Sequence, residues 1–224
     1  MKNRFFYAAF LFAFVLTGIF SCSNDDDTPS ATPPAAFFNY NVGNKWVYKR
    51  YENTNDNPNN FTFSGITDSV RVEAIVNING LLFSKLSHKK TGQAVYHEFL
   101  RTNNAGHLVG FTDLIYFDGN YSSINENNPS EVMHPGLDTA YEATASSPWG
   151  LLHYHLAAQA NITVEGNDYA VSPYLGDYTP NDPQFDNKTV EFNYKPRVGL
   201  VKQVCHSTVT NFSWEDRLVS YHLN

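Results

Sequence analysis

Two histidines separated by one tyrosine, His153 and His155, are the residues with the clearest capacity to bind a metal. On an extended strand, alternate side chains point to the same face and lie about 6.5 Å apart. Imidazoles so placed can hold zinc if a third ligand arrives from another segment, and His97, Glu98 and His134 are the candidates. The other interpretation is a pair of histidines on a polar strand face. A metal-dependent enzyme is therefore one hypothesis for this chain.

The candidate for a catalytic nucleophile is Cys205, which is followed by His206. A thiolate paired with an imidazole can attack a carbonyl. Neighbouring residues of a strand point to opposite faces, however, so these two side chains would not meet. We therefore expect Cys205 to be a buried, unreactive thiol. With no other catalytic or cofactor pattern, the sequence favours a protein that is not an enzyme and that needs no cofactor.

Two hydroxyl residues, Ser69 and Thr139, each follow an aspartate and precede an apolar residue. This pattern resembles the O-glycosylation site of exported proteins from Bacteroidota. A glycan requires an exposed hydroxyl. Ser69 falls on the expected wet face of a strand, and Thr139 lies at the end of a loop. Because three-residue patterns also arise by chance, glycosylation of either residue is one of two interpretations.

Aromatic residues make up 15% of the chain, with 17 Phe and 14 Tyr. Rings that line a dry concavity would bind lipid, whereas exposed rings with polar neighbours would bind sugar. The alternative is that they simply fill the core. The candidates for a ligand site are Phe61, Phe63, Phe111 and Trp149, together with Tyr116, Phe117, Tyr121 and Trp214.

The segments that must position these residues alternate between polar and apolar side chains. The alternation is clearest from Ser69 to Ile78, where Val70, Val72, Ala74, Val76 and Ile78 would share one face. Asn79-Gly80 follows directly and favours a type I′ turn into a return strand that starts at Leu81. Further strands are expected at 45–52, 95–102, 107–112, 151–164 (one strand or two), 168–171, 189–196, 200–210 and 214–223.

After residue 36, no segment keeps a helical period for three turns. Sequential strands joined by tight turns predict an all-β fold with an antiparallel meander. About ten strands in one sheet will curl strongly or close, so we expect one highly curved sheet or a barrel-like shell. A two-sheet β-sandwich is the alternative. The long segment 122–138 shows little pattern, and loops of this length are often functional.

The chain begins with Lys2 and Arg4, followed by an uncharged apolar run from Phe5 to Phe20. A basic start, an apolar stretch and a small residue before a cleavage site are typical of a secretory signal. The run has 16 residues, whereas a membrane-spanning helix needs about 20. Its end resembles the lipobox of bacterial lipoproteins, which implies that Cys22 becomes the N-terminus and carries a lipid anchor with acyl chains such as palmitate.

Residues 25–27 are three aspartates shortly after this cysteine, and 28–36 is rich in Pro, Ala and Ser. The acidic run resembles the surface-export tag of Bacteroidota lipoproteins; it can equally serve as a solvated tether. We therefore divide the chain into a signal peptide (1–21), a lipidated acidic and Pro-rich tether (22–36) and one β domain (37–224). The expected location is the outer membrane, on the cell surface or otherwise on the periplasmic face.

The formal net charge is −7, from 15 Lys and Arg against 22 Asp and Glu, and no basic stripe is present. This balance argues against a nucleic-acid partner. The expected membrane contact is the N-terminal lipid anchor.

Two motifs lie near the ends of the β domain: VGNKWVY at 42–48 and YKPRVGLVK at 194–202. They resemble the "VGN-x-W-x-Y" opening and "Y-x-P-x-VGLVK" close of secreted Bacteroidota lipoproteins. Those families are similar in shape to the curved-sheet lipoprotein carriers of the LolA/LolB type, which hold acyl chains on a concave face. The resemblance implies a fold and a compartment, and it transfers no catalytic residue.

The sequence thus supports three hypotheses, in this order. The first is a non-enzymatic envelope lipoprotein that binds an apolar or amphipathic ligand, such as a lipid, within its curved sheet. The second is a surface accessory module that recognises a glycan or another envelope protein through its long loops. The third is the metal-dependent enzyme built on His153 and His155.

Overall fold

The computed structural model describes residues 36–54, 60–114, 121, 124, 131–207 and 210–224. The expected signal peptide, the lipidation site Cys22 and nearly all of the tether lie outside the described residues. In the described part, all regular structure is β, and there is no helix that could cross a membrane. Residues 36–224 form one compact unit. Both of the apolar clusters described below lie within it, so it has what a domain needs to fold on its own.

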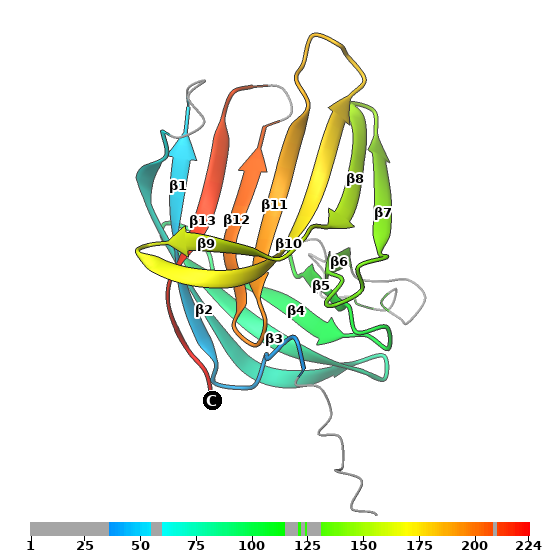
Figure 1. Ribbon diagram of the computed structural model, residues 1–224. Coiled ribbons are helices and arrows are strands. Elements are labelled where there is room, and N and C mark those ends of the chain that lie inside the picture. The colour runs from blue at the N-terminus through cyan, green and yellow to red at the C-terminus, as the bar shows by residue number, and fades with distance from the viewer. Residues whose placement is uncertain (1–35, 55–59, 115–120, 122–123, 125–130, 208–209) are drawn as a thin grey trace, which may run out of the picture. The chain divides into compact units, whose positions relative to one another are not determined.

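Thirteen strands are present in the described residues. They are β1 (Lys45–Asn53), β2 (Thr62–Ile78), β3 (Leu81–Lys90), β4 (Tyr96–Thr102), β5 (Leu108–Thr112), β6 (Glu131–His134), β7 (Glu142–Ser147), β8 (Gly150–Leu156), β9 (Ala160–Val164), β10 (Asn167–Pro180), β11 (Lys188–Lys195), β12 (Gly199–His206) and β13 (Ser213–His222) (Figure 1).

The strands form one antiparallel sheet in the order β6-β5-β4-β3-β2-β1-β13-β12-β11-β10-β8-β7, with β9 paired only to β10. This confirms the prediction of an all-β antiparallel meander in one curved sheet. The alternative, a two-sheet β-sandwich, is not what the strands form. The segment 151–164 divides into β8 and β9. Two strands, β6 and β7, were not expected, because short strands of four and six residues give little alternation to recognise.

The Asn79-Gly80 turn forms as the sequence predicts, with φ of 52° and 88° at its two residues. The alternating apolar side chains of β2 before this turn do not all lie on the same face of the sheet. A bulge between Val72 and Ala74 shifts the register of β2 against β3. Val72 consequently packs in the main apolar cluster, whereas Ile78 packs in a second cluster with Phe83 and other rings. A bulge bends its strand, so this one helps β2 to curl.

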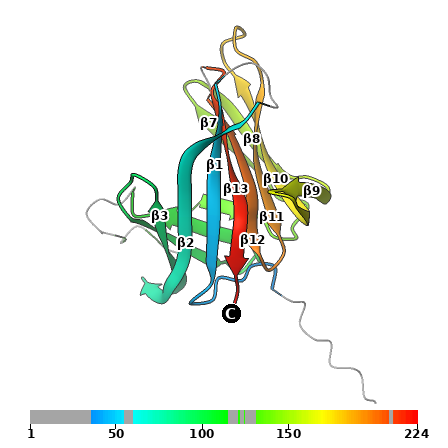
Figure 2. The same cartoon turned by 90° about the vertical axis from the view of Figure 1, so that its left-hand side faces the viewer.

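The outer face of the sheet is covered by its own hairpin. Residues 167–171 of β10 pair only with β9, while the rest of β10 pairs with β8 and β11. Figures 1 and 2 show the β9–β10 hairpin lying across β13 and β12, on the side opposite to β3–β5. Tyr169 and Val171 pack in the main cluster together with Val201. Glu165, in the hairpin turn, faces Arg217 at 3.7 Å and Lys49 at 3.9 Å.

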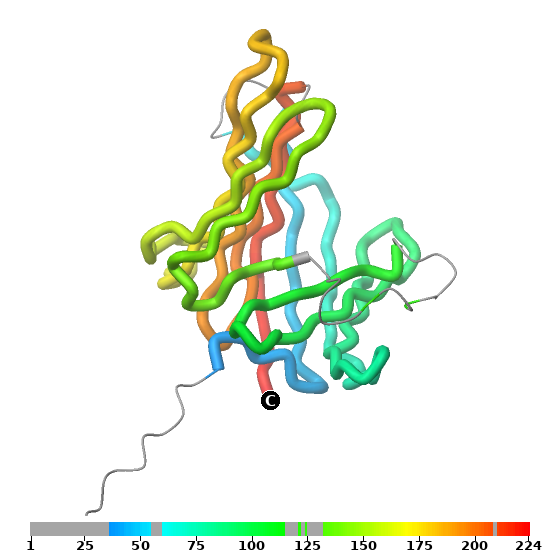
Figure 3. The backbone as a smooth tube through the Cα atoms, turned by 90° about the vertical axis from the view of Figure 1, so that its right-hand side faces the viewer, coloured from blue at the N-terminus to red at the C-terminus, as the bar shows by residue number. Residues whose placement is uncertain are grey.

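The two ends of the strand order, β6 and β7, do not pair with each other in the described part (Figure 3 views the molecule from the side of β7 and β8). His134 of β6 instead ties its end of the sheet to β10, which lies two places in from β7 in the strand order. Its Nε2–H donates to the Ser172 carbonyl of β10 at 3.0 Å, and its Nδ1 accepts from the Gly136 N–H at 3.0 Å. The ring is fully buried beside Phe37 and Tyr194. Burial lowers the pKa of His134 to about 4, so the imidazole is neutral.

We expect His134 to make the domain acid-sensitive. The unfolded chain binds a proton at this histidine below pH about 6.5, whereas the folded domain binds that proton only near pH 4. The contribution is complete above 6.5 and falls by about 3 kcal/mol as the pH approaches 4. Urea unfolding of residues 36–224 at pH 7, 5.5 and 4.5 measures it. His134→Gln keeps a donor for Ser172 without titrating, so its stability should fall less than that of the wild type over the same range. If the free energy of unfolding fell equally with pH in both proteins, His134 would not be the source of the acid sensitivity.

Candidate binding site

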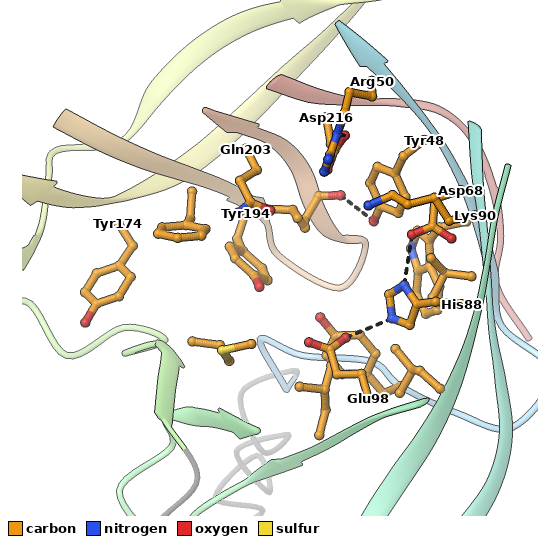
Figure 4. Close-up of a pocket in the computed structure, with 18 of the residues that line it drawn as sticks. Tyr48, Arg50, Asp68, His88, Lys90, Glu98, Tyr174, Tyr194, Gln203 and Asp216 are labelled. Carbon is orange, nitrogen blue, oxygen red and sulfur yellow. Dashed lines mark hydrogen bonds and ion pairs between the residues drawn. The ribbon is translucent and has the colours of Figure 1, made fainter. Parts of the chain in front are cut away.

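The inner face of the curved sheet encloses a cavity of about 360 Å³. Ten strands of the sheet contribute to its wall: β1, β2, β3, β4, β6, β8, β10, β11, β12 and β13. Its side chains are of two kinds. One part of the wall is apolar and aromatic, and the other part bears ionised groups (Figure 4).

The centre of the charged wall is His88 of β3, which lies between two carboxylates. Its Nδ1 lies 3.0 Å from Asp68 Oδ2, and its Nε2 lies 3.3 Å from Glu98 Oε2 (Figure 4). The three residues come from the neighbouring strands β2, β3 and β4, and each points inward. Because both ring nitrogens face a carboxylate, the arrangement requires the imidazolium, which donates on both sides.

The electrostatics of His88 agree with this geometry. Burial alone would lower the pKa of the imidazole, but the hydrogen bonds to Asp68 and Glu98 outweigh burial and raise the pKa to about 9. Tyr96 stacks on the ring with centroids 4.6 Å apart. His88 is therefore a fixed cation at neutral pH.

A second ion pair crosses from β1 to β13. The Arg50 guanidinium donates to both oxygens of Asp216, at 2.9 and 2.7 Å. The same guanidinium lies 4.0 Å from the centre of the Trp214 ring. A bidentate, stacked arginine is held rigidly in place, so this part of the wall is preorganised.

The apolar part of the wall includes four residues of the main cluster: Trp46, Val70, Leu86 and Leu100. Strand β6 adds Met133. Tyrosines complete the lining: Tyr40, Tyr48, Tyr154, Tyr174 and Tyr194. Burial raises the pKa of Tyr40, Tyr48 and Tyr194, so these phenols remain neutral. The hydroxyl of Tyr48 donates to the Leu200 carbonyl at 2.9 Å.

Two of the ionised residues of the wall are not fully paired in the described part of the chain. Lys90 lines the cavity, and its ammonium makes no ion pair or hydrogen bond there. The Oδ1 atom of Asp68 is buried without a hydrogen bond. Lys90 and Asp68 lie opposite each other across β3 and β2. The charged wall therefore presents one unused donor to the cavity, the Lys90 ammonium, beside an acceptor that is buried in the wall.

The predicted metal residues, His153 and His155, do lie on one face of β8, with ring centroids 5.7 Å apart. Their neighbours are carboxylates on the adjacent strands: Glu142 at 3.5 Å from His153 and Asp177 at 3.6 Å from His155. No group of three or more His, Cys, Asp or Glu side chains in the described residues is arranged to hold a metal. The candidate third ligands lie elsewhere, because Glu98 contacts His88 and His134 is buried beside Ser172.

The four aromatic residues expected at a ligand site do not line this cavity. Phe111 packs with Phe99 and Phe83 in the second cluster. Phe99 follows Glu98 along β4, and neighbouring strand residues face opposite sides, so this cluster lies on the outer face. Phe63 and Trp149 are exposed, and Phe61 is partly exposed. Of the wider set, Trp214 does line the cavity, while Tyr116 and Phe117 lie outside the described residues.

Ser69 and Thr139 are both exposed, which is the accessibility that glycosylation requires. Their modification stays a prediction. Cys205 is partly buried rather than fully buried, and burial raises the pKa of its thiol. Its Sγ accepts from Gln203 Nε2 at 3.3 Å. These features disfavour a thiolate at this position.

Sequence reasoning missed the charged wall, although a signal for it exists. Arg50 continues the inward alternation that begins at Trp46, and Asp68 precedes the alternation that begins at Val70. An ionisable residue at an inward position of a strand breaks the apolar pattern. That break indicates a polar cavity or a buried pair. Which strands bring these residues together depends on the curl of the sheet.

No protein-family model and no curated protein matches the chain. Two solved structures resemble it, each over 84% of this chain and 99% of the other. One is a "putative lipoprotein" from Parabacteroides distasonis ATCC 8503, with 14% identity and a TM-score of 0.42. The other is a "putative exported protein with YmcC-like fold" from Bacteroides fragilis NCTC 9343, with 10% identity and a TM-score of 0.40.

We expect the charged wall to make the domain sensitive to alkali. The stabilisation from His88 is complete below pH 6.5 and is lost as the pH rises through about 9, at a cost of about 3 kcal/mol. Unfolding of residues 36–224 by urea between pH 6 and 9.5 measures this loss. Glu98→Gln removes one of the two carboxylates, so the loss should begin at a lower pH. An unchanged profile in Glu98→Gln would show that Glu98 does not hold the proton on His88.

Proposed function

We propose that this chain is a non-enzymatic lipoprotein of the cell envelope whose β domain binds a small amphipathic molecule in the cavity. The observation that carries the proposal is the cavity itself, which is apolar and aromatic at one part and ionised at the other. A purely structural interior would be filled to the density of a crystal. About 360 Å³ lies within the size range of small-molecule sites in proteins.

The character of the wall supports an amphipathic ligand. Val70, Leu86 and Leu100 present aliphatic surface, which would bury a chain or a ring system. His88 and Arg50 are already fixed by carboxylates, so they form a rigid polar region that does not have to reorganise on binding. Such a wall orients a ligand with one apolar end and one polar end.

The location is proposed from the leader. The apolar run, the lipobox-like Cys22 and the three aspartates that follow support a lipid-anchored protein of the outer membrane, facing the cell surface. The periplasmic face is the alternative. A tether of about 15 residues can extend about 50 Å, which separates the cavity from the lipid surface.

The other two hypotheses gain less support. Recognition of a glycan or an envelope protein was assigned to the segment 122–138, of which most of 122–130 lies outside the described residues. The metal-dependent enzyme needs a third ligand near His153 and His155, and the described residues provide no such group. Both remain hypotheses.

We expect Cys22→Ala to abolish membrane attachment. Cells that express the full chain are grown with a radiolabelled fatty acid, and membranes are separated from soluble protein. The wild-type chain should be labelled and sediment with the membranes. The variant should lose the label, because the lipid is joined through the Cys22 thiol. Membrane-bound, labelled Cys22→Ala protein would contradict lipidation at this residue.

We expect the cavity to bind amphiphiles from an envelope extract. Residues 36–224 are incubated with a solvent extract of bacterial envelopes and examined by native mass spectrometry. Met133→Trp places a larger side chain in the cavity wall and should reduce retained ligand by about tenfold. Leu82→Trp is the matched control, because Leu82 is 63% exposed. Equal retention by both variants would place binding elsewhere, and no retention by the wild type would overturn the proposed function.

A further inference from the structure

The cavity wall contains equal numbers of ionised groups of each sign. In the described residues, the lining cations are Arg50, His88 and Lys90, and the lining anions are Asp68, Glu98 and Asp216. The count treats His88 as charged, which its position between two carboxylates requires. The six charges therefore sum to zero.

The charges also balance within each group of neighbouring residues on the wall. Arg50 and Asp216 neutralise each other through two hydrogen bonds. His88 shares one positive charge between two carboxylates, which leaves one negative charge in that group. The unpaired ammonium of Lys90, opposite Asp68 on the neighbouring strand, supplies the matching positive charge.

An ionised head group would disturb this balance. An ion that enters a cavity must give up its hydration, and only a field of opposite sign repays that cost. A wall whose charges sum to zero offers no net attraction to an ion of either sign. A head group without net charge gives up less hydration, and it can still use the unpartnered ammonium of the wall. A hydroxyl accepts from Lys90 without adding a charge to the cavity.

We propose that the cavity selects amphiphiles whose polar head bears hydroxyl groups and no net charge, over fatty-acid anions and over alkylammonium cations. This inference rests on the proposed function, because it names the class of ligand for the same cavity. Lys90 is the residue that contacts the head, and the apolar end lies against Leu86, Leu100 and Met133.

The test compares three probes with the same eight-carbon tail and different heads: octyl glucoside, octanoate and octyltrimethylammonium. Each is titrated below its micellar concentration into residues 36–224 at pH 7, and binding is followed by calorimetry. The fluorescence of Trp46 and Trp214, which line the cavity, gives a second readout. Octyl glucoside should bind at least about tenfold more tightly than either ion.

Charge-changing variants test the cause of the preference. Lys90→Met leaves the wall with one net negative charge, so octyltrimethylammonium should gain about tenfold while octanoate weakens. Glu98→Gln acts in the opposite direction and should favour octanoate. Lys89→Met is the matched control: Lys89 is the exposed neighbour of Lys90 on β3 and points to the other face, so the order of the three probes should not change. Glu98→Gln supplies the second arm if Lys90→Met does not fold.

The outcomes separate the inference from the proposed function. If octanoate or the cation binds the wild type as tightly as octyl glucoside, and Met133→Trp abolishes that binding, the cavity binds amphiphiles without this selectivity and the inference fails. If Lys89→Met shifts the order as much as Lys90→Met, the total charge of the protein decides and the inference also fails. If every probe that binds the wild type binds Met133→Trp equally, or if none of the three probes binds, the cavity is not the binding site and the proposed function fails with the inference.

Discussion

A single β-sheet has two faces to shield and no second layer to shield them, and this constraint shapes the whole domain. The described residues contain no helix and one continuous sheet, so the inner face can be buried only if the sheet curls onto itself. The bulge in β2 turns one alternating segment toward two different apolar clusters. The outer face is shielded by the chain's own β9–β10 hairpin. Each irregularity in the sheet thus serves the burial of one of its faces.

Curling leaves a further difficulty, because the ends of the sheet do not pair. An antiparallel sheet that stops short of closure exposes unpaired backbone groups at its edges. His134 of β6 links this edge to β10 by donating to the carbonyl of Ser172. A side chain can make such a link where strand pairing cannot, since it does not require the two strands to align. The space inside remains as a cavity rather than as packed core.

The charged wall is costly, and that cost is informative. Burying an ion pair in place of well-packed apolar side chains is often neutral or destabilising. His88 with its two carboxylates, and Arg50 with Asp216, would therefore stabilise the fold no more than well-packed apolar side chains in the same places. Both groups lie on the wall of the cavity, which also has aliphatic and aromatic lining. Their position on the cavity wall is the reason that we propose a role in recognition for them.

The fold was largely predictable from the sequence, because strands and tight turns are local features. Asn79-Gly80 predicted its turn, and residues 189–195 predicted β11 by their alternation. The division of β10 between two sets of partners was not predictable, since it depends on the curl of the whole sheet. The same limit applies to the site. Phe111 and Trp214 are both large rings in strands, and only the register decides that one packs outside while the other lines the cavity.

Two histidines, His88 and His134, show why register matters more than residue type. His88 and His134 have the same side chain, yet carboxylates hold the first as a cation and burial among rings holds the second neutral. The link from β6 to β10 uses the neutral form of His134, whose Nδ1 accepts from Gly136. Charge balance in the cavity depends on the charged form of His88. Both conditions hold together near neutral pH, so the range in which His134 links β6 to β10 is also the range in which the charges of the cavity wall sum to zero.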